Sequence, residues 1–181
     1  MPWREPATGR WLARTLCWAA AVCVVLYGAA YLLGRALAPT RQIGKTQVCV
    51  SNVRLLARAF ALYADDHEDR YPPSVVWMDA TGPYVVQERR FRCPAVEVEG
   101  AAAFGYAASA ALDGSARADL DMPGETPLVY DSTLLGRNAT DDGESLPMPG
   151  RHVRRLARDG PWEPANVVAY ADGRARLEWR R

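Results

Sequence analysis

Several residue types are scarce in this chain, and each scarcity excludes a class of function. The 181 residues include two histidines, and no Cys-x-x-Cys spacing occurs, so the sequence predicts no metal site and no cofactor. Lysine occurs once, at Lys45, and the formal net charge is +1. This charge balance gives no electrostatic basis for binding nucleic acid.

The usual catalytic motifs are also missing. There is no phosphate-binding loop, no dinucleotide fingerprint, and no Gly-x-Ser-x-Gly around Ser132 or Ser145. His152 could act as a general base with Asp131 or Asp172, but an ordinary hydrogen-bonding role in a loop is the favoured interpretation. The sequence therefore predicts a protein that is not an enzyme, and it identifies no small-molecule substrate.

Charge is absent from one long run, which lies between Arg14 and Arg35. Its residues 15–34 would form a helix about 30 Å long, the thickness of a bilayer's hydrocarbon core. A buried helix of a soluble domain rarely stays apolar on every face for this length. A cleaved signal peptide normally has a shorter apolar region, and Pro39 would hinder cleavage after Ala38. We therefore favour an uncleaved membrane anchor over these two alternatives.

The predicted topology is single-pass, with the lipid bilayer as the first partner. Basic residues are equally frequent on both sides of the run, so their count does not decide the orientation. We adopt the ordinary single-anchor arrangement in the inner (plasma) membrane, with the N-terminus cytoplasmic. Its parts are a tail at 1–14, a transmembrane anchor at 15–34, a linker or helix extension at 35–47, and an extracytoplasmic domain at 48–181.

The four cysteines divide into two pairs. Cys17 and Cys23 fall in the apolar run, where a free thiol behaves as a small apolar residue. Cys49 and Cys93 fall in the soluble part. Outside the cytoplasm this second pair could form a disulfide, and two unpaired buried thiols are the equally weighted alternative.

An amphipathic helix is predicted at about residues 46–66. Apolar residues recur there at spacings of four and three, which places them on one helical face. They are Cys49, Val53, Leu56, Phe60 and Tyr63. Pro39 is expected to kink or interrupt the helix before this segment, and Tyr71-Pro72-Pro73 should end the segment.

Strands are predicted toward the C-terminus. One is expected at 126–131, and residues 166–171 and 174–179 alternate in polarity around Asp172-Gly173, as in a hairpin with a type I′ turn. The Gly-, Pro- and Asp-rich segment 132–160 is expected to be a long solvated loop. The predicted fold class is α+β: a transmembrane helix leads to an amphipathic helix packed on a small antiparallel sheet.

Short motifs follow one another in a distinctive order between residues 48 and 179. The first are Cys49-Val-Ser-Asn52, Tyr63-Ala-Asp-Asp, Tyr71-Pro72-Pro73 and Tyr84-Val85. The next are Phe91-Arg-Cys93-Pro94, Phe104-Gly105-Tyr106, Thr126-Pro-Leu-Val-Tyr-Asp131, Arg151-His152, Ala165-Asn166-Val167 and Asp172-Gly173. This series resembles a bacterial branch of the pilin-like proteins related to type II secretion pseudopilins, a branch with a C-terminal His…Asp-Gly pattern.

The resemblance implies a pilin-like fold and a non-enzymatic, structural role in a type II secretion or type IV pilus-like assembly. The implied partners are pilin-like or secretion-system subunits. The residues that carry the structural motifs are Tyr63, Pro72, Pro73, Pro94, Asp131, His152, Asn166, Asp172 and Gly173.

The chain departs from this family at two points. The processing motif Gly-Phe-Thr-Leu-x-Glu is not found, and no acidic residue lies between Glu5 and Asp65. The family's glutamate neutralises a neighbouring subunit's freed amine in the filament, so its absence favours an alternative function: an anchored extracytoplasmic binding or sensing domain that no longer enters a filament. The interval from His152 to Asp172 is also longer than in the family, so 153–164 looks inserted.

Overall fold

The computed structural model describes residues 7–97, 103–155 and 160–178. The chain divides into two compact units, Met1–Arg41 and Gln42–Arg181, and each is described by itself. Helix α1 (Ala7–Asp66) contributes residues to both units.

The first unit is the apolar part of α1. Its large side chains are exposed, including Trp18 and Val24. Among the described residues, α1 is the one helix long and apolar enough to cross a membrane, and a signal sequence near the N-terminus would pass the same test. Pro39 lies inside α1, so of the two expected effects, a kink or an interruption, the interruption does not occur. Proline removes one backbone hydrogen bond, which the turns on either side of it can tolerate.

The second unit begins with the amphipathic part of α1. Cys49, Val53 and Leu56 are fully buried, which confirms the predicted stripe. Its last member, Tyr63, is half-buried and stacks on His67 with ring centroids 3.8 Å apart. The helix ends at Asp66, as predicted.

Short helices connect α1 to the sheet. They are η1 (Ser74–Val76), α2 (Trp77–Thr81), η2 (Gly82–Tyr84), η3 (Glu88–Phe91), η4 (Ala110–Leu112) and η5 (Arg117–Asp119). Trp77 enters the core from α2 and donates its indole N–H to the Ala139 carbonyl at 2.9 Å. The α2 segment is thereby fixed to the chain that precedes β3.

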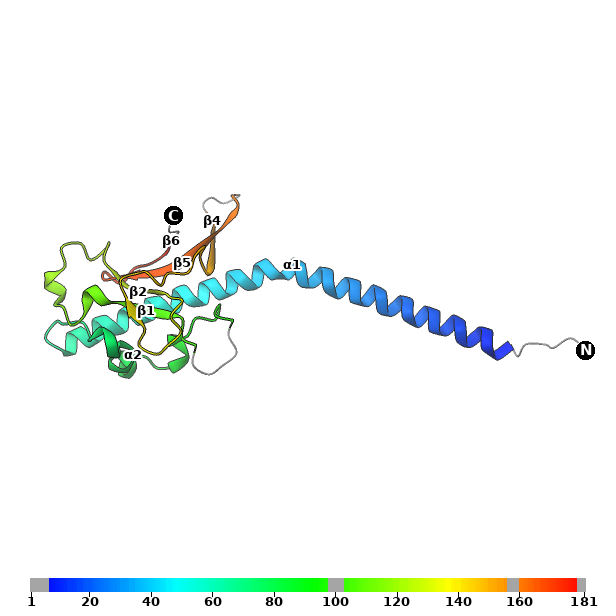
Figure 1. The fold of residues 1–181 in the computed structure, drawn as a ribbon, viewed down its shortest axis with the longest axis horizontal. Helices are drawn as coiled ribbons and strands as arrows, with labels where there is room; N and C mark the ends of the chain where they lie inside the picture. The colour runs from blue at the N-terminus through cyan, green and yellow to red at the C-terminus, as the bar shows by residue number, and fades with distance from the viewer. Residues whose placement is uncertain (1–6, 98–102, 156–159, 179–181) are drawn as a thin grey trace, which may run out of the picture. The chain divides into compact units, whose positions relative to one another are not determined.

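The sheet has six strands in the order β3-β1-β2-β5-β4, with β6 also paired to β5 (Figure 1). The strands are β1 (Tyr106–Ser109), β2 (Pro127–Asp131), β3 (Thr140–Asp141), β4 (His152–Arg155), β5 (Trp162–Tyr170) and β6 (Ala175–Glu178). The α+β class is therefore observed. The expectation of a purely antiparallel sheet is wrong, because β3 pairs with β1 in parallel. After β2 the chain passes to the other edge of β1, where β3 runs in the same direction as β1.

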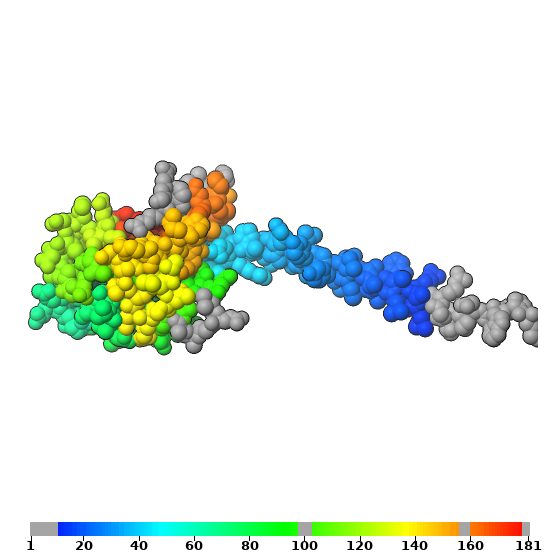
Figure 2. All heavy atoms as spheres, viewed as in Figure 1, coloured from blue at the N-terminus to red at the C-terminus, as the bar shows by residue number. Residues whose placement is uncertain are grey.

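One local prediction about the C-terminal half is wrong. The segment 132–160 is not one long loop, because it contains β3 and β4. Described residues of the segment that looks inserted, 153–155 and 162–164, belong to an antiparallel pair between β4 and β5, in which His152 pairs with Ala165. Composition predicted a loop here because strands this short depend on the strands beside them rather than on local propensity. Residues 132–155, yellow to orange, cover much of the face of the Gln42–Arg181 unit that Figure 2 shows.

The predicted hairpin around Asp172-Gly173 exists between β5 and β6. Its turn is not type I′, because only Gly173 of that dipeptide has positive φ, at 80°. Gly173 N–H donates to the Tyr170 carbonyl at 2.9 Å, and Tyr170 N–H donates to Arg174 at 2.8 Å. This is the three-residue loop in which a glycine with positive φ follows a tighter turn.

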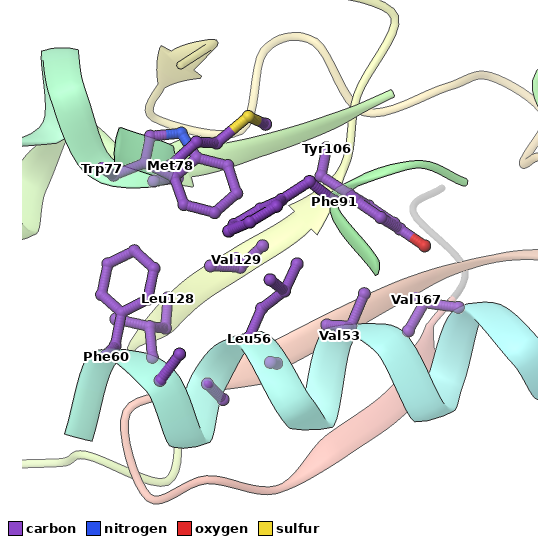
Figure 3. Close-up of a cluster of buried hydrophobic side chains, with 14 of the residues drawn as sticks. Val53, Leu56, Phe60, Trp77, Met78, Phe91, Tyr106, Leu128, Val129 and Val167 are labelled. Atoms are coloured by element: carbon purple, nitrogen blue, oxygen red, sulfur yellow. The ribbon is translucent and has the colours of Figure 1, made fainter. Parts of the chain in front are cut away.

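The main core lies between α1 and one face of the sheet (Figure 3). Val53, Leu56 and Phe60 from α1 meet Val129 of β2 and Val167 of β5. A smaller cluster on the opposite face of the sheet contains Ala107, Tyr130, Val168 and Tyr170. The sheet therefore carries apolar side chains on both faces.

Candidate functional site

Two cysteines meet in the core beside the buried stripe of α1. Cys49 projects from the buried stripe of α1, and Cys93 lies in the turn after η3. The backbone N–H of Cys93 donates to the Phe104 carbonyl at 2.8 Å, which fixes this turn beside β1. The two Sγ atoms are 2.8 Å apart, and both residues are present as free cysteines. The disulfide between them stays a prediction.

An aspartate and a histidine from the sheet complete this cluster. Asp131 is the last residue of β2 and His152 is the first of β4, and both strands pair with β5. His152 Nε2 is 3.3 Å from Asp131 Oδ2 and 3.4 Å from Cys93 Sγ. All four side chains are buried, and their ligand atoms lie within 4.8 Å of one another.

Three further groups surround the four side chains. The Tyr106 hydroxyl donates to Cys49 Sγ at 3.2 Å. The backbone N–H of Val167 donates to Asp131 Oδ2 at 2.6 Å, and the Arg151 guanidinium lies 3.8 Å from Asp131 Oδ1. The cluster is thus held by polar contacts from β1, β5 and the residue before β4.

A glycine makes room for this arrangement. Gly105 has φ of +79°, and a Cβ there would lie 2.4 Å from Val96 Cγ2 and 3.0 Å from the Arg151 guanidinium. The Gly105 carbonyl accepts a hydrogen bond from Arg151 at 2.8 Å. Because a side chain at this position would meet both neighbours, the close approach of Arg151 to the cluster depends on glycine.

The pKa values of three residues in the cluster are strongly perturbed. The hydrogen bond with Cys93 raises the pKa of Cys49 well above its usual value, and burial raises it further. The same hydrogen bond lowers the pKa of Cys93 despite burial. Burial acts to lower the pKa of His152, but its hydrogen bonds with Asp131 and Cys93 outweigh burial and raise that pKa to about 9.

Two polar atoms of this cluster lack hydrogen-bond partners in the described part of the chain. They are Asp131 Oδ1 and His152 Nδ1. Their residues are 0% and 1% exposed, so water at the surface does not reach them. An unsatisfied buried polar group costs about 1–3 kcal/mol, so protein contacts alone leave this pair incompletely compensated.

The arrangement does not form a Cys–His–Asp nucleophilic triad. Such a triad needs the cysteine at one imidazole nitrogen and the carboxylate at the other. Here Cys93 Sγ and Asp131 Oδ2 both face Nε2 of His152. The burial of all three residues also leaves a substrate no access to the sulfur.

The structure brings together some of the residues singled out from the sequence and separates others. Asn166 lies beside the cluster: its Nδ2 donates to the Pro147 carbonyl at 2.9 Å, and its Oδ1 accepts from Arg151 N–H at 3.2 Å. Pro94 directly follows Cys93 and is exposed. The others lie outside the cluster: Tyr63, Pro72 and Pro73 near the end of α1, and Asp172 and Gly173 in the β5–β6 loop.

Sequence reasoning missed Tyr106 and Arg151 as parts of the cluster. Arg151 and His152 were expected in a solvated loop, but His152 is buried and Arg151 is half-buried. Cys49 and Cys93 are 44 positions apart, and Cys93 and His152 are 59 apart. No short spacing motif could reveal a cluster assembled from such distant segments.

A shallow cleft lies over the opposite face of the sheet. Its volume is about 430 Å³, and its lining includes Tyr130, Tyr170 and the carboxylates of Glu125, Asp142 and Glu178. The Tyr130 hydroxyl already donates to Asp141, and the Tyr170 hydroxyl to Glu178. The cleft is therefore a partly polar surface whose hydroxyl groups are already engaged.

Comparison with known proteins finds no matching family model, no matching curated protein and no matching solved structure.

Proposed function

We propose that this protein is a membrane-anchored, pilin-like structural subunit, with its Gln42–Arg181 unit outside the cytoplasm. The proposal joins the motif series between residues 48 and 179 to the observed order of elements: an apolar helix, an amphipathic helix and a C-terminal sheet. The function would be non-enzymatic. Its partners would be the bilayer and related subunits of a type II secretion or type IV pilus-like assembly.

One observation carries the proposal. A single helical element, α1, supplies both the uncharged run at residues 15–34 and the buried stripe from Cys49 to Phe60. The exposed apolar side chains of the first part need a nonpolar environment, which a bilayer or the helices of neighbouring subunits would provide. This division of one helix between anchor and core is what the pilin-like resemblance implies.

Topology is the first test. Reporters that are active on only one side of the membrane are fused after Arg181 of the full chain, and the product is followed in washed envelope fractions. We expect the chain in the membrane with the C-terminal reporter outside the cytoplasm. A cytosolic reporter or a wholly soluble product would overturn the proposed anchoring.

The filament role needs a separate test, because the chain lacks the family's glutamate. Mass spectrometry of the mature N-terminus distinguishes the two functions. A new, methylated N-terminus near Gly9, together with pilin-like subunits captured by cross-linking, is expected for a filament subunit. An intact Met1 or Pro2 without such partners would contradict filament entry.

The alternative is an anchored binding or sensing domain outside the filament. The cleft lined by Tyr130 and Tyr170 favours this second function, because its mixed polar and apolar lining suits a small ligand. It keeps the same topology but predicts no subunit partners, so the cross-linking experiment separates it from the leading proposal.

A further inference from the structure

The buried cluster of Cys49, Cys93, Asp131 and His152 has the donor set of a transition-metal site. Two sulfurs, one imidazole nitrogen and one carboxylate oxygen come within 4.8 Å of one another from four segments of the chain. Thiolate, imidazole and carboxylate are the groups that bind Zn²⁺ in proteins. We propose that these four residues form a closed, four-coordinate site for Zn²⁺.

The distances within the cluster support four-coordination. From usual Zn–ligand bond lengths, a tetrahedral site places its nitrogen and oxygen about 3.4 Å apart and its sulfur and nitrogen about 3.5 Å apart. The corresponding distances are 3.3 Å from His152 Nε2 to Asp131 Oδ2 and 3.4 Å from Cys93 Sγ to His152 Nε2. The two sulfurs, at 2.8 Å, must separate by about 1 Å to reach the spacing of two zinc thiolates. Rotation about the Cα–Cβ bond of either cysteine would give this separation.

The surroundings of Cys49 favour a thiolate over a disulfide. The Tyr106 hydroxyl donates to Cys49 Sγ at 3.2 Å inside the core. A metal-bound thiolate is a charged acceptor and forms a strong hydrogen bond with this donor, whereas an uncharged sulfur is a weak acceptor. A disulfide would also leave the polar side chains of His152 and Asp131 beside uncharged sulfurs, which are weak hydrogen-bond acceptors.

The charges of the loaded site balance. Two thiolates and the Asp131 carboxylate exceed the double positive charge of the ion by one unit, with His152 neutral. The Arg151 guanidinium, 3.8 Å from Asp131 Oδ1, supplies the compensating positive charge. A buried site is tolerated only when its net charge is compensated in this way.

Outer contacts also hold the ligands in place. Asp131 Oδ2 accepts from the Val167 N–H at 2.6 Å, and Asp131 Oδ1 has no hydrogen-bond partner among the described residues. The backbone of β5 thus positions the carboxylate, whose Oδ2 also faces His152 Nε2.

The proposed site is structural rather than catalytic. Its four residues are at most 3% exposed, which leaves no open position for water or substrate. The ion would link α1, the turn at Cys93, β2 and β4 within the folded unit. Because such a site does not exist in an unfolded chain, metal binding would stabilise the fold. The inference does not depend on whether the protein enters a filament.

The test uses the full-length chain, purified in detergent with reductant and freed of metal by a chelator. Co²⁺ and then Zn²⁺ are titrated into it. We expect one Co²⁺ per chain, with the visible absorption of a tetrahedral ion and a near-ultraviolet thiolate-to-cobalt band, and displacement of Co²⁺ by Zn²⁺. A reduced wild-type chain that is folded by circular dichroism and binds no Co²⁺ would overturn the proposal.

Variants assign the ligands. C49S, C93S, D131N and H152Q should each lose at least about 10-fold in metal affinity, and Zn²⁺ should raise the melting temperature of the wild type but not of these variants. C17S and C23S are matched controls, because these cysteines are exposed on α1 outside the cluster and should bind normally. D131N keeps the shape of the side chain, so it separates lost binding from lost folding. Normal binding by C49S would overturn the proposal.

The native redox state provides an independent check. Mass spectrometry of protein prepared with metal present and thiols alkylated before any reductant is added should show four alkylated cysteines after denaturation and chelation. Alkylation of only Cys17 and Cys23, with a mass two hydrogen atoms below that of the doubly alkylated reduced chain and Cys49 joined to Cys93, would instead establish a disulfide and overturn the metal site.

Discussion

The Tyr106 hydroxyl donates a hydrogen bond to Cys49 Sγ at 3.2 Å, linking the first residue of β1 to the buried face of α1. Tyr106 and Cys49 are both fully buried. The hydroxyl is therefore withdrawn from water, and its polar partner is this sulfur. This hydrogen bond acts to lower the pKa of the Cys49 thiol, and it also joins β1 to α1.

Replacing Tyr106 by phenylalanine removes that donor and leaves the ring. We expect Y106F to weaken Zn²⁺ binding about 10–100-fold, as is usual when an outer contact to a metal ligand is lost. Competition with a chromophoric chelator would measure the affinity. Y71F is the matched control, since Tyr71 is also buried but its hydroxyl reaches the Ala171 carbonyl at 3.5 Å, away from the cluster. Equal affinities for Y106F and Y71F would contradict the role given to Tyr106.

Both the backbone conformation at position 150 and the atoms around it require glycine. It has φ of +126°, and a Cβ there would lie 2.7 Å from the Ala165 backbone nitrogen. We expect G150A to lose about 1–3 kcal/mol in free energy of unfolding, measured by denaturant titration. G136A is the control, because Gly136 has open space around its Cβ position. An unchanged midpoint for G150A would argue against this packing of the chain before β4.

Leu56 tests the packing of α1 on the sheet. Its side chain is fully buried in the main cluster, so L56A should lower the free energy of unfolding by about 2–5 kcal/mol through lost burial and a cavity. Val86 is 96% exposed, and V86A should change it by less than about 0.5 kcal/mol. Similar values for both variants would show that this part of α1 does not pack in the core.

Asn166 forms hydrogen bonds with the residues that precede β4. Both ends of its amide are engaged, with Arg151 N–H and with the Pro147 carbonyl. N166A should lower the free energy of unfolding by about 1–3 kcal/mol, because it leaves buried backbone groups without hydrogen-bond partners. Hydrogen exchange should show the added opening at Arg151. Q87A is the control, because Gln87 is exposed. If N166A loses no more free energy of unfolding than Q87A, the hydrogen bonds of Asn166 do not stabilise the fold as we expect.

A charge in the uncharged run tests the anchor. L26R places an arginine near the centre of residues 15–34, where insertion into a bilayer costs about 2.5–3.5 kcal/mol. The fraction of chain that stays in carbonate-washed membranes should fall. V86R adds the same charge to an exposed position in the other unit and should leave that fraction unchanged. Full retention of L26R would count against a membrane-spanning run.

Features with a local cause were predictable from the sequence. The spacing of Cys49, Val53, Leu56 and Phe60 indicated the buried face of α1, and alternation around Asp172-Gly173 indicated the hairpin. Both depend on periodicity within about 20 neighbouring residues, which a sequence displays directly. The α+β class followed from their order.

Features made by distant pairing were not predictable. Thr140 and Asp141 form β3 only because β1, far earlier in the chain, offers a parallel edge. The cluster of Cys49, Cys93, Asp131 and His152 is a stronger case, since its four side chains come from segments that share no spacing pattern. The sequence predicted no metal site; the site that we propose would need one histidine only, because the fold brings three other donors to it.

The double-sided character of β5 has a practical consequence for engineering. Val167 and Ala169 belong to the cluster against α1, while Val168 and Tyr170 belong to the cluster on the other face. Inserting or deleting one residue within β5 would exchange the two sets and shift its register with β2, β4 and β6 simultaneously. Epitope tags and labelling sites should therefore be kept out of this strand, even where its ends reach the surface.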